Sequence, residues 1–295
     1  MNWQADRQAE RESSWADLCR RMRACSPDCS LRLLLLAAHP DDEAIGASAV
    51  LARFPRSLTV FLTDGAPRDP SFWTGGPYDS REHYAQTRQE EAKRALALAG
   101  VTQPQIFWLG AVDQDAAFEI TTLVEKFRKL IAEHKPDVVI THPYEGGHPD
   151  HDSAALIAKM ALALVTDIAP PELLEMTSYH ARDGQCLTGE FLDPEALEDS
   201  RLRQFTRASA KVVFELSEED RQRKRRMLDA YSSQRLVLEN FSIGREPLRP
   251  APEYDFSRPP HPGKLWYECM EWPMTGARWR ELAVAALHRV EAPSC

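Results

Sequence analysis

The sequence predicts an α/β fold with a Rossmann-like, mostly parallel, doubly wound sheet, helices on both faces and an elaborated C-terminal third. Apolar runs of strand length alternate with helical patterns between residues 31 and 179, which is the βαβ rhythm of parallel sheets. The first run, residues 31–38, is apolar except for Arg32, as expected for a strand buried on both faces. Polar turns follow two of the runs, and ligands of open α/β sheets bind at the carboxyl ends of the strands.

Local signals predict the individual elements. Trp15, Leu18 and Met22 recur at helical spacing and indicate an amphipathic helix over residues 4–25. Gly100 favours a helix end and Ser217 a helix start. The expected strands are residues 31–38, 58–63, 105–109, 137–141, 173–179 and 211–216, and the expected helices are residues 43–54, 81–99, 118–134, 151–166, 218–233 and 278–290.

The last third of the chain has a looser pattern. Residues 245–263 contain six of the 21 prolines, which predicts a long irregular connection. We find no internal repeat and no low-complexity linker. The sequence therefore predicts one domain over residues 1–295, with an N-terminal helix within residues 1–30, a core at 31–235 and a C-terminal extension at 236–295.

Composition narrows the functional classes. The formal net charge of −9 argues against general nucleic-acid binding, because phosphate backbones select basic surfaces. The first twenty residues are strongly charged, and no uncharged apolar stretch approaches membrane-spanning length. Six cysteines without a CxxC pair are best interpreted as reduced thiols. We expect a cytoplasmic protein with a small-molecule substrate; a homo-oligomer is compatible with the sequence.

Two polar clusters suggest a single metal site. His39 and Asp42 are three residues apart in a strand-to-helix turn, so both can converge on one point. His148 and His151 share that spacing at the start of another helix. A catalytic zinc needs three nitrogen or oxygen ligands and an open position for water. His39, Asp42 and His151 would supply this set for one Zn²⁺ per chain, and it also accepts Fe²⁺, Co²⁺ or Mn²⁺.

The remaining polar residues of the clusters have candidate catalytic roles. An Asp ligand leaves the bound water less acidic, so a neighbouring base is needed, and Asp41 is the candidate. His148, held by Asp150, would be an imidazolium that stabilises the oxyanion or protonates the leaving amine. Either cluster alone is equally well explained by helix capping. Their conjunction, each behind an apolar strand, favours a site.

The two motifs resemble those of the PIG-L/LmbE-like zinc-dependent N-acetylglucosaminide deacetylases. The resemblance covers residues 31–235, and it implies the same ligands, with Asp41 as general base, His148 as the oxyanion-stabilising imidazole and Asp150 as its orienter. It also suggests that Arg88 meets sugar hydroxyls, although a structural pair of Arg88 with Glu91 or another acid explains it equally well. Further matching residues are Thr63, Asp64, Gly65, Arg88, Gln89, Glu90, Glu91, Lys224, Ser233 and Gln234.

The sequence departs from the family pattern at one position. Some members carry a tyrosine two residues before the first histidine of the second motif, where this chain has Gly146. Tyr144, four residues before His148, is a candidate substitute. The loop over residues 64–82 is a candidate wall for the sugar, because pyranose faces stack on aromatic rings such as Trp73. An ordinary surface loop is the alternative. Asp64, Trp73, Tyr144 and Arg88 are thus the candidate substrate contacts.

The main hypothesis is a metal-dependent hydrolase that removes an N-acetyl group from an N-acetylglucosamine-type amino sugar or sugar conjugate. Hydrolysis of another amide or of a carbamoyl group is an alternative, as is a non-catalytic sugar-binding protein on the same scaffold. A nucleotide-binding Rossmann protein is disfavoured, because the turn after the first strand is acidic and lacks a GxGxxG sequence.

Overall fold

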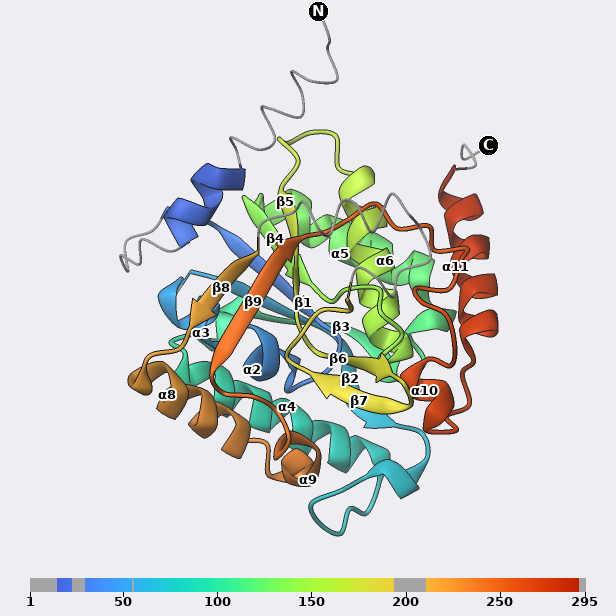
Figure 1. Ribbon diagram of the computed structural model, residues 1–295, viewed down its shortest axis with the longest axis horizontal. Helices are drawn as coiled ribbons and strands as arrows, with labels where there is room; N and C mark the ends of the chain where they lie inside the picture. Colours follow the sequence, from blue (N-terminus) through green and yellow to red (C-terminus); the bar gives the residue numbers. More distant parts are fainter. Residues whose placement is uncertain (1–14, 23–29, 55, 194–210, 292–295) are drawn as a thin grey trace, which may run out of the picture.

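The computed structural model describes residues 15–22, 30–54, 56–193 and 211–291, and a seven-stranded mixed sheet forms its centre (Figure 1). The strand order is β3-β2-β1-β4-β5-β9-β8, with the first five strands parallel to one another and β9 antiparallel to both of its neighbours. This confirms the predicted mostly parallel α/β fold. The strands are β1 (Leu33–Ala37), β2 (Leu58–Pro67), β3 (Ile106–Asp113), β4 (Val138–Thr141), β5 (Glu172–Met176), β8 (Val212–Glu215) and β9 (Arg245–Pro250).

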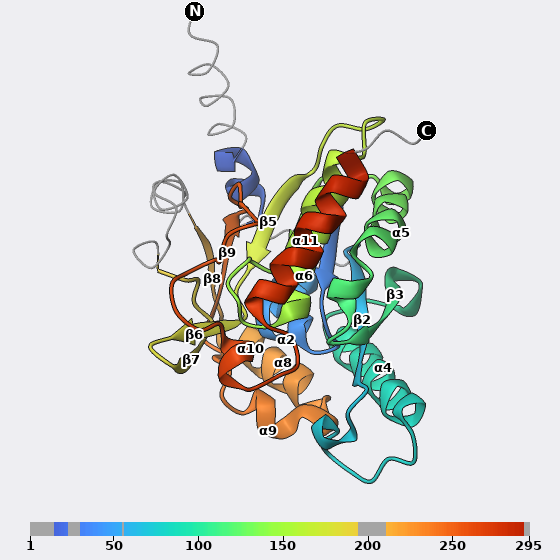
Figure 2. The same ribbon diagram turned by 90° about the vertical axis from the view of Figure 1, so that its right-hand side faces the viewer.

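Helices cover both faces of the sheet, and β1 explains why its sequence is apolar throughout. Leu33 and Leu35 belong to one apolar core, whereas Leu34 and Leu36 belong to a second core on the opposite face. The helices of the two faces lie on opposite sides of the sheet in Figures 1 and 2. The first face carries α2 (Asp42–Gly46), α3 (Ser48–Arg53), α4 (Arg81–Leu98) and α8 (Glu218–Asp229), and the second α5 (Ile120–His134), α6 (Pro149–Ala163) and α11 (Gly276–Glu291).

Some predicted bounds were wrong near the carboxyl ends of the strands. The helix expected over residues 43–54 is two short helices, because the backbone at Ala47 has φ −140°. β2 continues beyond the expected residue 63 to Pro67, and β3 continues beyond residue 109 to Asp113. The two strands extend together, since Pro67 pairs with Asp113.

The proline-rich segment over residues 245–263 is not entirely irregular, as its first six residues form β9. Leu248 lies opposite both Met176 of β5 and Val212 of β8. β9 contains Pro247 and Pro250 although proline lacks the N–H that a strand between two neighbours normally uses. The prediction failed because this composition disfavours an interior strand.

The strand expected over residues 173–179 is divided. β5 ends at Met176, and Tyr179 begins a separate two-stranded hairpin of β6 (Tyr179–Arg182) and β7 (Gln185–Thr188). Asp183 and Gly184 turn the hairpin with positive φ angles of 52° and 75°, which an Asp-Gly turn favours. The hairpin lies near α10 (Trp266–Cys269) in both views (Figures 1 and 2).

The remaining elements are short. Residues 15–22 are helical, and the rest of the helix predicted over residues 4–25 lies outside the described residues. In the described part of the chain, no helix has both the length and the apolar character needed to cross a membrane. The short elements are η1 (Pro70–Phe72), η2 (Gln103–Gln105), η3 (Ala116–Phe118), η5 (Ser232–Gln234) and α9 (Arg235–Leu238).

Candidate metal centre

The sheet brings the two polar clusters together. β1 and β4 are adjacent and parallel, with Leu35 opposite Ile140. Residues 39–43, here called the first turn, follow β1, and residues 142–151, the second turn, follow β4. Both turns therefore lie at the same edge of the sheet, where parallel strands present their carboxyl ends.

The three predicted ligands lie side by side. His151 Nε2 is 3.2 Å from Asp42 Oδ1, and His39 Nδ1 is 3.4 Å from Asp42 Oδ2. One ligand atom from each of the three side chains lies within 4.8 Å of the others, which is close enough to share one ion. All three residues are buried.

The chemistry of these groups fits a divalent cation. His151 Nε2 is buried and has no hydrogen-bond partner among the described residues, as expected of a nitrogen that awaits a metal. Burial, together with nearby His142, lowers the pKa of His151 to about 3. Burial raises the pKa of the Asp42 carboxyl, but the neighbouring His151 and His142 outweigh burial. They hold this pKa well below its usual range. A neutral imidazole and an ionised carboxylate are the forms that bind metals.

Asp150 contacts two histidines, but its carboxylate faces His39. Its Oδ2 lies 3.2 Å from His39 Nε2, while its backbone N–H donates to His148 Nδ1 at 3.1 Å. Burial lowers the pKa of His39, but the carboxylates of Asp113, Asp150 and Asp42 outweigh burial and raise it well above its usual value. A carboxylate on the far nitrogen of a ligating histidine fixes the orientation and basicity of the ring. The structure thus gives Asp150 a carboxylate contact that the sequence analysis did not anticipate.

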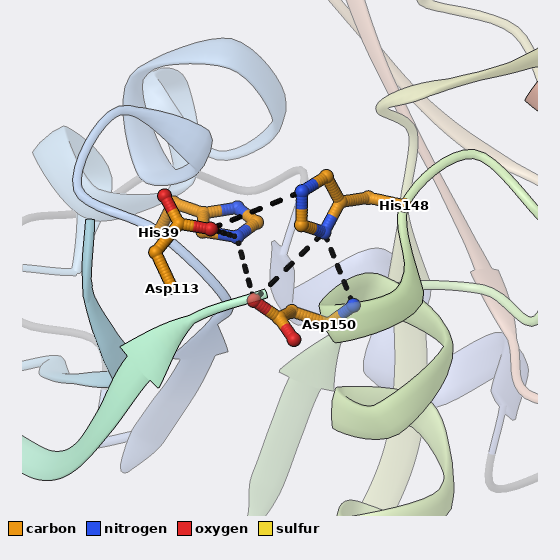
Figure 3. Close-up of side chains that lie close together, drawn as sticks. All are labelled: His39, Asp113, His148 and Asp150. Atoms are coloured by element: carbon orange, nitrogen blue, oxygen red, sulfur yellow. Dashed lines mark hydrogen bonds and ion pairs between the residues drawn. The ribbon is translucent and has the colours of Figure 1, made fainter. Parts of the chain in front are cut away.

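His148 is the N-cap of α6, and its contacts bear on its protonation. Because Nδ1 accepts the Asp150 N–H, a neutral ring carries its proton on Nε2. Burial, followed by the charge of His39, holds the pKa of His148 well below its usual range. Figure 3 shows this ring facing His39, with Asp113 and Asp150 close to both. This arrangement favours a neutral Nε2–H donor rather than the imidazolium expected from the sequence.

Asp41 occupies a strained backbone position beside the ligands. Its φ of 135° is uncommon for any residue other than glycine. The Asp41 N–H donates to Glu43 Oε2 at 3.0 Å, and Arg88 Nη2 donates to Asp41 Oδ2 at 2.9 Å. Burial raises the pKa of Asp41 to about 6, while the positive charge of Arg88 acts in the opposite direction. These polar contacts keep the backbone of Asp41 in its strained conformation.

Arg88 has an acidic partner, as one of the two sequence-based interpretations required. That partner is Asp41, because Glu91 instead accepts the backbone N–H of Ser233 at 2.9 Å. Arg88 also donates to the carbonyl of Pro40 and to Ser233 Oγ. The side chain is 2% exposed, and its contact with a sugar stays a prediction.

The other three candidate substrate contacts already have partners within the chain. Asp64 pairs with Arg81 at 2.5 Å, and Trp73 Nε1 donates to the carbonyl of Pro67 at 2.8 Å. Tyr144 is buried in the second core, where it stacks on Trp279 and donates to the carbonyl of Arg258. Tyr144 is therefore placed as a core residue, because the second turn packs under the C-terminal extension.

Sequence reasoning missed three residues of this region: Asp113, Tyr179 and Trp272. Asp113 Oδ1 lies 3.2 Å from His39 Nε2 and pairs with this ring (Figure 3). The Tyr179 ring lies 5.1 Å from that of His151, and Trp272 lies 4.7 Å from His148. A signal existed for Asp113, since it ends a strand that the prediction stopped too early.

Tyr179 lies among the carboxylates of the centre. Burial, and then the negative charges of Asp42, Asp41 and Asp113, raise the pKa of Tyr179 well above its usual value. The phenol therefore stays protonated and can donate a hydrogen bond. His142, the third histidine of the second turn, stacks on His151 with 4.0 Å between ring centroids and accepts the N–H of Ala38.

Comparisons with known proteins match this part of the chain. Residues 34–162 match the model of the PIG-L family, described as GlcNAc-PI de-N-acetylase. The chain is 27% identical over 182 residues to the 1D-myo-inositol 2-acetamido-2-deoxy-alpha-D-glucopyranoside deacetylase 1 of Catenulispora acidiphila, and 29% identical over 170 residues to the corresponding deacetylase of Streptomyces scabiei. The matches cover 49% and 47% of this chain and 52% and 50% of the relatives, so the chain spans about half of their length.

Solved structures agree on the fold. A deacetylase from the biosynthesis pathway of teicoplanin aligns with a TM-score of 0.55 and 17% identity, over 76% of this chain and 99% of that chain. At this identity the similarity establishes the fold alone. The resemblance drawn from the two motifs is confirmed: residues 34–162 of the chain match the PIG-L/LmbE-like GlcNAc-PI de-N-acetylase family.

Proposed function

We propose that this chain is a metal-dependent hydrolase that removes the N-acetyl group from an N-acetylglucosamine-type amino sugar or sugar conjugate. The observation that carries the proposal is the meeting of His39, Asp42 and His151 beside the non-ligating carboxylate of Asp41. The family match over residues 34–162 supports the same chemistry. We infer one Zn²⁺ or other divalent ion per chain, with these three residues as its ligands.

The metal has two roles in this proposal. When bound, a divalent cation lowers the pKa of a coordinated water molecule and polarises a carbonyl oxygen. The buried, unpartnered Nε2 of His151 and the ionised carboxylate of Asp42 are available to hold it. Asp150 would keep His39 in its ligating orientation through the 3.2 Å contact with Nε2.

Asp41 would act as the general base. It would accept a proton from the attacking water as the new C–O bond forms, and would return that proton to the nitrogen as the amide C–N bond breaks. The products are acetate and the free amine, with one water consumed. Arg88, 2.9 Å from the carboxylate, would hold Asp41 in place and keep part of it ionised.

Two donors are available for the amide oxygen. His148 would donate from Nε2, whose tautomer is set by the Asp150 N–H on Nδ1. Tyr179 would donate from its phenol and so supply the donor that the second turn lacks where Gly146 stands. Both donors lie next to a proposed ligand, since the His148 ring is 4.3 Å from that of His39 and Tyr179 is 5.1 Å from His151.

The test is amine release from a defined panel. The chain would be depleted of metal, reconstituted with one equivalent of Zn²⁺ and given N-acetylglucosamine, its inositol glycoside, an N-carbamoyl analogue and an unrelated N-acetyl amino acid. We expect amine from the acetylated sugars only with metal present. A preference for the N-carbamoyl analogue or the amino acid would favour the other amide hydrolases, and saturable sugar binding without any release would favour a binding protein.

Two variants test the assigned roles. Asp41→Asn is expected to keep one metal per chain and to lower kcat about a thousandfold. Tyr179→Phe keeps the ring against His151 and is expected to lower kcat about tenfold with metal content unchanged, as one hydrogen-bond donor is lost. Wild-type turnover in Asp41→Asn would refute the proposed base.

A further inference from the structure

A cavity of about 210 Å³ opens beside the candidate metal centre, and the C-terminal extension forms one of its walls. Asp113 lines both the cavity and the centre. Trp272, on the opposite wall, lies 4.7 Å from the ring of His148. A group attached to a substrate amide in the centre can therefore extend directly into this space.

The cavity walls present aromatic rings. Phe72, from the loop after β2, stands edge-on to Trp272 with 6.4 Å between ring centroids. Trp272 Nε1 is buried and has no hydrogen-bond partner in the described ranges of the chain. The part of Trp272 that lines the cavity therefore offers aromatic surface, which suits contact with a flat ring.

Two arginines line the cavity in the described part of the chain, and both pair with carboxylates. Arg68 pairs with Asp115 at 2.7 Å, and Arg278 pairs with Glu281 at 2.9 Å. Asp113 adds a carboxylate to the lining. Phosphate recognition normally uses unpaired Arg or Lys side chains or backbone N–H groups. Both arginines that line this cavity are already paired with carboxylates.

On the basis of the proposed function, we infer that this cavity is a subsite for an uncharged, flat ring that is joined to the amino sugar. The volume suits one ring, since pockets for larger ligands span roughly 300–1,000 Å³. Phe72 and Trp272 supply the aromatic surface of this subsite. Trp272 lies outside the family match at residues 34–162, so one aromatic wall of the subsite comes from the C-terminal extension.

The test compares substrates that share the acetylated sugar. The probes are the 4-methoxyphenyl, methyl and myo-inositol glycosides of N-acetylglucosamine, with the aryl glycoside in both anomers, and N-acetylglucosamine 1-phosphate. We expect kcat/KM for the better aryl anomer to exceed that for the methyl and inositol glycosides about fivefold, because aromatic contacts are worth about 1 kcal/mol. The phosphate ester is expected to be the poorest substrate.

Variants connect the preference to the cavity. Trp272→Ala and Phe72→Ala are each expected to reduce the aryl-to-methyl ratio of kcat/KM to about twofold or less, and Trp272→Phe to give an intermediate ratio. This ratio is the readout because any disturbance of His148 would lower kcat/KM for the aryl and methyl substrates together. Leu236→Ala is the control, since this residue is 73% exposed and does not line the cavity. It should leave the ratio unchanged.

The outcomes separate the two proposals. If the N-acetylated sugars release amine but the phosphate ester or the inositol glycoside is preferred, or if the ratio survives in Trp272→Ala and Phe72→Ala, the subsite inference is wrong and the proposed function stands. If no sugar is deacetylated, the proposed function is wrong. Calorimetric binding of 4-methoxyphenyl glucosaminide then tests the cavity alone, with weaker binding expected in Trp272→Ala and equal binding overturning the inference.

Discussion

The two turns of the candidate centre reach the same point by different physical means. The first turn, residues 39–43, is short and carries its strain at Asp41, with φ 135°. Buried polar groups hold it, since Glu43 accepts the N–H of Asp41 and the phenol of Tyr231. The second turn, residues 142–151, is longer and contains Gly146 with a φ of 68°. The positive φ falls on a glycine, so no residue with a side chain is under backbone strain in this turn.

The second turn depends on close approach and on distant parts of the chain. A Cβ on Gly147 would lie 2.0 Å from the carbonyl oxygen of Tyr179, so only glycine fits beside the hairpin. Gly146 accepts the N–H of Trp266 at 2.8 Å, and Trp279 Nε1 donates to the carbonyl of Pro149 at 3.0 Å. The C-terminal extension, residues 236–295, therefore supports the second turn from outside the family match.

The contrast shows how one site can hold a catalytic group rigidly in one turn while a separate segment of the chain supports the other turn. The first turn fixes Asp41, which would act as the base, through contacts with Arg88 and Glu43. The second turn places His148 and His151 at the start of α6. The extension packs against this turn and supports the position of both histidines. We expect the extension to vary the substrate while the first turn preserves the chemistry.

The largest effect should follow from loss of a ligand in either turn. His39→Ala and His151→Ala are expected to lose metal affinity by more than about a hundredfold each, because both side chains serve one ion. Metal content by elemental analysis after dialysis measures this, and amine release should fall to background in both. His288→Ala, on the exposed surface of α11, is the control. If either ligand variant still bound one metal ion per chain, the two turns would not share one ion, and the comparison between them would be wrong.

The sequence predicted the first turn and the parallel strands well because their signals are local. Apolar runs such as residues 31–38 mark strands buried on both faces, and His39 and Asp42 lie three residues apart in one turn. His151 could be added because β1 and β4 end at the same edge, which the βαβ rhythm implies. These inferences need no knowledge of contacts between distant segments.

The contacts that long-range packing decides could not be predicted. β9 has a proline-rich sequence, yet Leu248 sits between β5 and β8. Tyr179 and Trp272 reach the centre from the hairpin and the extension, and neither stands in a motif. The carboxylate of Asp150 lies 3.9 Å from His148 Nδ1, but it also lies 3.2 Å from Nε2 of His39, 111 residues away, and only the second contact was missed. Local patterns identify the polar residues of a site, and tertiary packing decides their partners.

A smaller effect should follow from removing the support of the second turn. Arg249 of β9 is buried between Glu145 and Glu175, at 3.0 and 2.8 Å. Arg249→Met leaves two buried carboxylates without their cation, so we expect a loss of about 3 kcal/mol in the free energy of unfolding. Chemical denaturation measures this as one transition, because β9 belongs to the central sheet.

Arg245→Met is the matched control for Arg249→Met. Arg245 lies on the same strand, but its ion pair with Glu190 is exposed, and we expect a change within about 0.5 kcal/mol. Glu145 also accepts the N–H of Leu192, so this residue of the second turn keeps one hydrogen bond when Arg249 is lost. Equal destabilisation by the two substitutions would show that the extension does not support the second turn through this ion pair.

The smallest predicted effect tests the strain of the first turn directly. Asp41→Gly and Asp41→Ala both remove the carboxylate from Arg88, so they share the cost of an unpaired buried guanidinium. They differ in that glycine accepts φ 135° without strain, and we expect Asp41→Gly to be more stable than Asp41→Ala by about 1 kcal/mol. Paired thermal and denaturant unfolding measures the difference. An alanine variant as stable as the glycine variant would mean that the first turn relaxes, and that its strain does not distinguish it from the second.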